Sequence, residues 1–324
     1  MKAFDFLADA QSVPDPKDWQ QCGTLARAKI EGADDRAIQK SLTDARTQFL
    51  RNHFIAAGQS TQRGQGSARV RTSDGLVRLQ AAELLPAVPD LACLPEGSAT
   101  LELGFSLLSP LLTRDDDPFY LFDNPVRKDH IFSAPFLAAA SVKGLCADAY
   151  RRAFSDQPAT ASIEEWRGAD AHALRLFGIA DDGLQQGSRV GRLHFFPVWF
   201  DLVQFLVMNP RDPKRGTGKL PIQFEAVAPV DARGQAVRGT LAAFYFNPLG
   251  DSDKTPGDAI ADVARFIAAC AAWLPVLGLG AKRLAGYGAI LPTDAVCHAA
   301  WGSWHLAGED SWMKLATTIA EAGE

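Results

Sequence analysis

Glycine and basic residues gather near the C-terminal end of the chain in a pattern that could bind phosphate. Segment 278–288 reads GLGAKRLAGYG. Glycine lets backbone N–H groups approach an anion closely, and neighbouring cations add charge-assisted contacts. The segment is therefore either a phosphate-binding loop or a loop whose glycines only turn the chain. Its candidate ligand-binding residues are Gly278, Gly280, Lys282, Arg283, Gly286 and Gly288.

A second candidate anion site lies at 141–144, where a helix predicted over 138–154 begins. Ser141 could cap this helix, and the free N–H groups of a helix start favour an anion. Lys143 adds a cation and Gly144 leaves room for another chain to approach. Arg151, two turns further along, could face the same ligand. The alternative is a capped helix with solvated basic side chains.

A third basic segment, 209–219, reads NPRDPKRGTGK. Its proline and glycine content predicts an irregular loop. A basic loop of this kind suits backbone contacts along single-stranded RNA, although an exposed charged loop without a ligand is the alternative. The candidate contacts are Arg211, Lys214, Arg215 and Lys219.

Acid chemistry would centre on Asp123, which lies in LFDNPVR at 121–127. A carboxylate beside a scissile phosphate can hold a divalent metal or orient the attacking hydroxyl. Asp115, Asp116 and Asp117 lie close by, and the region could equally be a solvated acidic turn. The histidines and cysteines show no metal-ligand spacing. We therefore expect no cofactor, except a metal such as Mg²⁺ if Asp123 is catalytic.

The composition of the 324 residues is that of a globular protein, with a net charge of −5. This charge disfavours nucleic-acid binding as a whole-molecule property, but phosphate contacts depend on where Lys and Arg cluster. Five scattered cysteines without a CxxC pair fit a reducing cytoplasm. The apolar run 266–277 is too short to span a bilayer. We expect a cytoplasmic protein with no membrane partner.

Hydrophobic periodicity predicts the elements that would position these segments. Strands are expected at 99–108, 189–196, 239–246 and near 287–291, helices at 138–154 and 257–274, and a closing helix at the C-terminal end. This order is that of the ferredoxin-like βαββαβ fold, an α+β class also used by RNA-recognition modules. Long excursions interrupt it after the first strand and between the second and third. Residues 1–96 are predicted to be a helical extension, and 97–324 the ferredoxin-like domain.

The glycine-rich segment would follow a helix and precede a strand. This order excludes a dinucleotide-binding motif, because such a motif follows a strand and opens a helix.

Three segments carry a resemblance to a known family: 278–288, 140–151 (ASVKGLCADAYR), and LFG at 176–178 followed by GRLHF at 191–195. Together they resemble the RAMP superfamily of CRISPR-associated proteins. The glycine-rich ending is most similar to the Cmr-type subunit that caps the guide RNA.

This resemblance implies a guide-RNA-binding subunit of a type III (Cmr or Csm) antiviral effector complex. Its partners would be guide RNA, target RNA, other RAMP-type subunits and a large polymerase-like subunit. In family members that cleave target RNA, the catalytic residue is an Asp in the loop after the first strand, and the context of Asp123 resembles it. A metal-dependent endoribonuclease is therefore the alternative, and an unrelated soluble α+β protein is a third.

Overall fold

The computed structural model describes residues 70–72, 75–113, 124–158, 160–179, 189–208, 222–231, 233–247 and 256–323. The chain divides into two compact units. Unit 1 consists of Met1–Arg78, Thr113–Pro135 and Asp201–Val227, and unit 2 of Leu79–Leu112, Phe136–Phe200 and Ala228–Glu324. The predicted boundary at residue 96 stays a prediction, because most of the proposed extension lies outside the described residues.

Unit 2 is built on a five-stranded antiparallel sheet with the order β12-β11-β2-β10-β6. The strands are β2 (Ala99–Leu107), β6 (Leu193–Phe195), β10 (Arg238–Tyr245), β11 (Ile290–Ala299) and β12 (Gly302–Ala307). Apolar residues recur at every second position of the central strand β2, and Leu101, Leu103 and Phe105 are at most 1% exposed. Leu103 lies opposite Leu241 on one side and Ala295 on the other. All three residues are buried and belong to the core.

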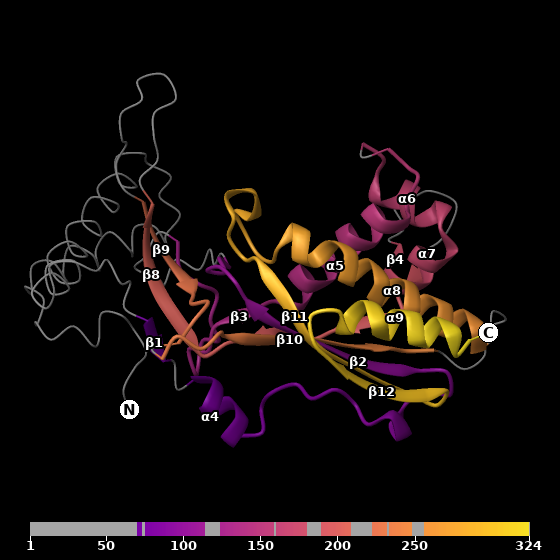
Figure 1. Cartoon of the computed structure of the whole chain (residues 1–324), viewed down its shortest axis with the longest axis horizontal. Helices are drawn as coiled ribbons and strands as arrows, with labels where there is room; N and C mark the ends of the chain where they lie inside the picture. The colour runs from indigo at the N-terminus through magenta and orange to yellow at the C-terminus, as the bar shows by residue number, and fades with distance from the viewer. Residues whose placement is uncertain are drawn as a thin grey trace, which may run out of the picture. The chain divides into compact units, whose positions relative to one another are not determined.

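Helices α5 (Ala139–Phe154), α8 (Pro256–Leu277) and α9 (Ser311–Glu321) lie on one face of this sheet (Figure 1). Helix α8 packs against both α5 and α9. The fully buried Trp312 of α9 donates its indole N–H to the carbonyls of Gly104 and Asp294, each at 3.0 Å. Each large apolar side chain buried here contributes about 1.5–3 kcal/mol. Among the described residues, Asp258–Leu277 of α8 is the one segment long and apolar enough to cross a membrane.

Shorter elements complete unit 2. They are η2 (Leu91–Cys93), α6 (Ile163–Ala169), α7 (Ala171–Phe177), η3 (Arg283–Ala285), the pair β3 (Phe136–Leu137) and β7 (Val198–Trp199), and the pair β4 (Gly178–Ile179) and β5 (Arg189–Val190). Helix α4 (Gly75–Ala81) spans the division between the units. A capping box formed by Ser162 and Glu165 starts α6, and the Asp170 carboxylate caps α7.

Unit 1 holds a three-stranded antiparallel sheet of order β1-β8-β9, with β1 (Val70–Thr72), β8 (Leu202–Met208) and β9 (Ile222–Val227). Glu225 of β9 is 1% exposed and binds the Lys128 ammonium group at 2.8 Å. Its carboxylate also accepts from the Val126 amide, and its own amide donates to the Asn124 carbonyl. Segment 124–128 is thereby fixed against β9. Parts of both predicted excursions thus lie together in unit 1.

The mixed α/β class with an antiparallel sheet is confirmed. Strands β2 and β10 and helices α5 and α8 lie where they were predicted, with ends that differ by at most three residues. The predicted strand at 189–196 is divided into β5 and β6, which lie in different sheets. Gly191 lies between them, where a Cβ would overlap the backbone at Phe177. The hairpin partner β12 and the strands β8 and β9 were not predicted.

Candidate nucleic-acid interface

The glycine-rich loop 278–288 connects α8 to β11 and depends on left-handed backbone geometry. Gly278, Gly280, Gly286 and Gly288 have φ angles of 72°, 71°, 83° and 70°. A Cβ on Gly288 would overlap the carbonyl oxygen of Leu279, and a Cβ on Gly280 would overlap that of Leu112. Only glycine combines this φ with so close an approach of two backbones.

Many of the loop's amides are already bonded to backbone carbonyls. The bonds run from Gly278 to Leu274 (2.9 Å), Leu279 to Gly288 (2.7 Å), Ala281 to Leu112 (2.8 Å), Ala285 to Lys282 (2.9 Å), Gly286 to Arg283 (2.9 Å) and Gly288 to Pro110 (2.9 Å). These amides therefore serve the fold, and a phosphate cradle made of them is disfavoured. A ligand-binding role for the loop stays a prediction, and it would involve the tip of the loop.

The tip of the loop consists of Lys282 and the short turn η3, which begins at the second basic residue, Arg283. Lys282, just before it, has a φ of 56° and is exposed. Arg283 Nη1 lies 3.9 Å from an Asp148 carboxylate oxygen on α5. The tip therefore lies beside α5, although the two segments are far apart in the sequence.

Asp148 belongs to a largely exposed stripe on helix α5. Ser141, Gly144, Asp148 and Arg152 follow one another at intervals of three or four residues and so lie on one side of the helix. Ser141 is not the cap that the sequence predicted, because α5 begins earlier, with Ala138 as its N-cap. A Cβ on Gly144 would meet nothing within 4 Å.

Lys143 lies on a different side of α5 from this stripe. It is five residues from Asp148, which corresponds to about 140° around the helix. Burial lowers the pKa of Lys143, and the nearby Arg167 guanidinium lowers it further. Burial and the Lys143 charge likewise lower the pKa of His194 on β6. Two groups of predicted basic residues therefore lie on different sides of α5. Lys143 lies on one side, and Lys282 and Arg283 lie near Asp148 on another.

Arg151 has partners within unit 2. Its Nη2 donates to the carbonyls of Pro158 (2.8 Å) and Ala161 (3.1 Å), and its guanidinium lies 5.9 Å from the ring centre of Trp166. It therefore holds the chain that follows α5, and its predicted contact with RNA stays a prediction.

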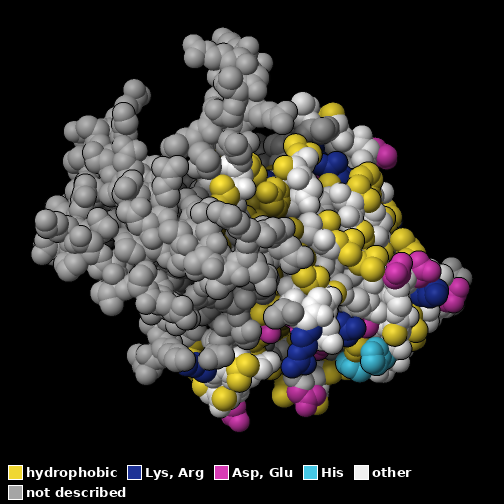
Figure 2. Space-filling view, turned by 60° about the vertical axis from the view of Figure 1, so that its left-hand side comes forward, with side chains coloured by type: hydrophobic (Ala, Val, Ile, Leu, Met, Phe, Trp, Pro, Cys, Tyr) yellow, Lys and Arg dark blue, Asp and Glu magenta, His cyan; other side chains and the backbone are white. Residues whose placement is uncertain are grey.

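Figure 2 shows how the cations are distributed on one face of the molecule. On the described part of that face, Lys and Arg side chains (dark blue) lie in separate places among apolar and uncharged ones. On the described part of this face, the cations therefore form small local groups instead of one broad basic patch.

Several predicted site residues lie outside the described residues. They are Asp123 and the four cations of the second excursion, Arg211, Lys214, Arg215 and Lys219. The described chain resumes at Asn124, which β9 holds through Glu225. In the part of the chain that the structure describes, no group of three or more His, Cys, Asp or Glu side chains could hold a metal ion.

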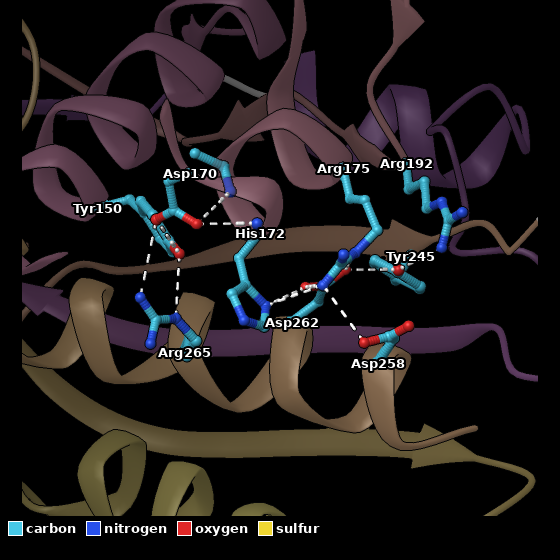
Figure 3. Close-up of polar contacts among 10 residues, drawn as sticks. Tyr150, Asp170, His172, Arg175, Arg192, Tyr245, Asp258, Asp262 and Arg265 are labelled. Atoms are coloured by element: carbon cyan, nitrogen blue, oxygen red, sulfur yellow. Dashed lines mark hydrogen bonds and ion pairs between the residues drawn. The ribbon is translucent and has the colours of Figure 1, made fainter. Parts of the chain in front are cut away.

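The sequence did not predict a buried polar network around Asp262 of α8 (Figure 3). This fully buried carboxylate accepts from Nε and Nη2 of Arg175 and from the hydroxyl of Tyr245, each at 2.8 Å, and lies 2.6 Å from His172 Nδ1. Arg192 donates to the same tyrosine at 3.1 Å. The feature of the sequence that could have indicated this network is Asp262 itself, an aspartate within a strongly apolar helix.

The network sets the charge state of Asp262 and connects three elements. Burial alone raises the pKa of this carboxyl group, but hydrogen bonds from His172, Arg175 and Tyr245 outweigh it, so that the pKa is lowered. A second cluster joins α5 to α8, since Tyr150 donates to Asp170 at 3.0 Å and accepts from Arg265 at 3.1 Å. Both clusters link elements of unit 2, and we interpret them as supports of the core beneath α5.

No protein-family model matches the chain, and no curated protein matches it. The structure is similar to a chain in the cryo-EM structure of the Type III-B Cmr-beta bound to cognate target RNA. The TM-score is 0.42 and the identity 15%, and the match covers 63% of this chain but only 61% of that one, which is less than two thirds of its length. A chain of the Csm3-Csm4 subcomplex in the type III-A CRISPR-Cas interference complex matches with a TM-score of 0.40 and 16% identity, over 69% of this chain and 95% of that one. The structural neighbours are thus chains of type III-B Cmr and type III-A Csm structures.

Proposed function

We propose that this chain is a RAMP-type, RNA-binding subunit of a type III CRISPR effector complex and that it holds the guide RNA. One observation carries the proposal. The two segments that most resemble the RAMP superfamily, 140–151 and 278–288, lie side by side, with Arg283 of one 3.9 Å from Asp148 of the other. The resemblance implies that both segments line one RNA-binding face, and their proximity supports this proposal.

The topology of unit 2 supports the same proposal. Along the chain, the main sheet receives β2, then β6 after α5, then β10, and finally β11 after α8. In space these strands are ordered β11-β2-β10-β6, and both helices lie on one face (Figure 1). We infer from this order that unit 2 has a ferredoxin-like βαββαβ core, to which β12 and α9 are added.

Gly144 gives a further argument for a ligand at the α5 stripe. A glycine in the interior of a helix costs about 0.5–1 kcal/mol relative to alanine. No neighbour within 4 Å of its missing Cβ accounts for it. A bound RNA backbone would account for it, because close approach to the helix requires the absence of a side chain. Gly144, Lys282 and Arg283 would then border one path.

Titration of a single-stranded RNA with the full-length protein at several salt concentrations tests the proposal. Exchanging Lys282 and Arg283 together for alanine should weaken binding and lower the slope of log K against log salt by about 1.4, since each phosphate contact to a single strand contributes about 0.7. The matched control removes the charges of Lys314 and Arg233, which are exposed elsewhere in unit 2. It should leave affinity and slope nearly unchanged.

The outcomes separate three interpretations. If the wild-type protein neither binds single-stranded RNA nor co-purifies with a guide, it is an unrelated α+β protein. If it binds RNA but the exchange of Lys282 and Arg283 has no effect, the glycine-rich loop is not part of the site. Equal losses in the double variant and its control would indicate only a loss of overall charge.

A further inference from the structure

We propose that one base of a single-stranded RNA stacks on a pair of aromatic rings in unit 2, those of His194 on β6 and Phe244 on β10. The inference rests on the proposed function and adds a base contact to it. Segment 191–195, to which the proposed function gave no part, supplies the histidine. The two rings are called the ring pair below.

Both side chains of the ring pair point away from the helices of unit 2 (Figure 1). Their neighbours in the chain point toward α8, since the Tyr245 hydroxyl donates to a carboxylate of that helix at 2.8 Å. The ring centre of Phe195 likewise lies 5.9 Å from that of Phe266 on α8. Because successive side chains of a strand alternate between the two faces of a sheet, His194 and Phe244 lie on the opposite face.

The two rings are already stacked on one another. His194 and Phe244 are direct partners in the register of β6 and β10, and their ring centres are 4.7 Å apart with 14° between the ring planes. Phe246 meets His194 edge-on at 6.2 Å, and Phe196 lies 6.0 Å from Phe244. All four side chains are partly exposed, whereas the core aromatic Phe105 is fully buried. The cluster therefore presents aromatic surface outside the core.

A further flat ring can be added to this stack at its histidine end. Strand β6 is the last strand in the order β12-β11-β2-β10-β6, so no further strand of this sheet lies beyond His194. On the other side, Phe244 has Thr100 of β2 as its partner, and Thr100 is only 7% exposed. The strand order thus limits the addition of a base to the edge of the sheet.

Lys143 of α5 brings a positive charge to the same edge. Its charge reaches His194, whose pKa is lowered by burial and then by Lys143. The imidazole ring is therefore uncharged near neutral pH. Among the described residues, Lys143 has neither a hydrogen bond nor an ion pair, and the nearby Arg167 guanidinium adds positive potential to its surroundings. An anion close to Lys143 would be favoured by both charges.

A nucleotide matches both parts of this edge. Proteins that bind single strands stack bases on aromatic side chains and place cations along the phosphates, and stacking of this kind tolerates any base. An apolar side chain from a protein partner would cover the ring pair but would bury Lys143 further without an anion. A free phosphate would use Lys143 but would leave the ring pair unused.

Affinity measurements with full-length protein and a mixed-sequence single-stranded RNA test the inference. The His194→Ala variant should bind about five-fold or more weakly, as expected when one base loses its stacking partner. The dependence of its affinity on salt should stay that of the wild type, because no phosphate contact is removed. His194→Phe should bind like the wild type, since it keeps a flat ring. Lys143→Ala should instead lower the slope of log K against log salt by about 0.7.

His305→Ala is the matched control. It removes the same kind of ring from an exposed position on β12, the opposite edge strand, and the register places His305 on the same face of the sheet as Phe244. This variant should bind RNA like the wild type. A second measurement needs no variant: after irradiation of wild-type protein with RNA that contains 5-iodouridine, cross-links should map to peptides that contain His194 or Phe244.

The results distinguish this inference from the proposed function. If the wild type binds no RNA, the proposed function fails, and the stacking contact fails with it. If RNA binds with the expected dependence on Lys282 and Arg283, but His194→Ala binds like the wild type, only the stacking contact is refuted. Equal losses in His194→Ala and His305→Ala, or cross-links confined to other peptides, would also refute it. Loss of a protein neighbour from the assembled complex, with RNA affinity intact, would assign the ring pair to a protein contact instead.

Discussion

Asp262 offers the clearest test of what holds unit 2 together. Replacing it by alanine removes the carboxylate that binds Arg175, Tyr245 and His172, at distances of 2.6–2.8 Å. The guanidinium of Arg175 would then stay buried, with 8% of that residue exposed, without its main anion. Breaking a buried ion pair on one side costs about 3–5 kcal/mol, a large part of the stability of an ordinary domain, which is about 5–15 kcal/mol.

Urea unfolding followed by tryptophan fluorescence measures this effect in unit 2, because six of the seven tryptophans lie there. With a slope of about 2–3 kcal/mol per molar urea, the midpoint of Asp262→Ala should fall by about 1–2 M. The matched control is Asp258→Ala on the same helix, whose carboxylate is 35% exposed and 3.7 Å from Arg175. Because solvent screens this pair, we expect a loss below about 1 kcal/mol.

The pH dependence gives a second measurement of the same carboxylate. The pKa of Asp262 is lowered in the folded protein. The contribution of this carboxylate to the free energy of unfolding is therefore complete above its pKa in the unfolded chain, about 3.9, and is lost as pH falls through its lower pKa in the folded protein. The difference in stability between wild type and Asp262→Asn should therefore be constant near neutral pH and shrink in acid below about pH 4. An Asp262→Ala variant as stable as Asp258→Ala would refute the reasoning.

Three further predictions concern the remaining candidate residues. Asp123→Ala in an assembled complex should abolish cleavage of target RNA if this subunit is the endoribonuclease, and unchanged cleavage would exclude that alternative. Glu225→Ala should destabilise unit 1 by about 3–5 kcal/mol, because the buried Lys128 loses this carboxylate. Hydrogen exchange in β9 should accelerate while the tryptophan fluorescence of unit 2 stays the same. Unchanged hydrogen exchange in β9 would contradict the prediction. Gly144→Ala should raise the free energy of unfolding by about 0.5–1 kcal/mol, which thermal melting measures. The same exchange should weaken RNA binding, which an RNA titration measures. Unaltered RNA affinity would show that no ligand approaches α5 at this position.

The sequence by itself determined the main elements of unit 2, because their signals are local. The alternation over 99–108 predicted β2, and the period of 3.6 residues predicted α5 and α8 to within three residues. Glycine at 278, 280, 286 and 288 indicated a sharp loop between helix and strand. In each case the conformation follows from neighbouring residues and their backbone preferences.

Only the tertiary structure decided which distant residues meet. Nothing in the spacing of Asp262, Arg175 and Tyr245 indicated a shared network, since three separate elements bring them together. The same holds for Lys128 with Glu225, and for Arg283 with Asp148. Packing also determined that amides at the base of the loop, such as those of Leu279, Ala281 and Gly288, are bonded to backbone carbonyls. Such pairings depend on sheet order and helix rotation, which are set by burial across the whole core and leave no local trace in the sequence.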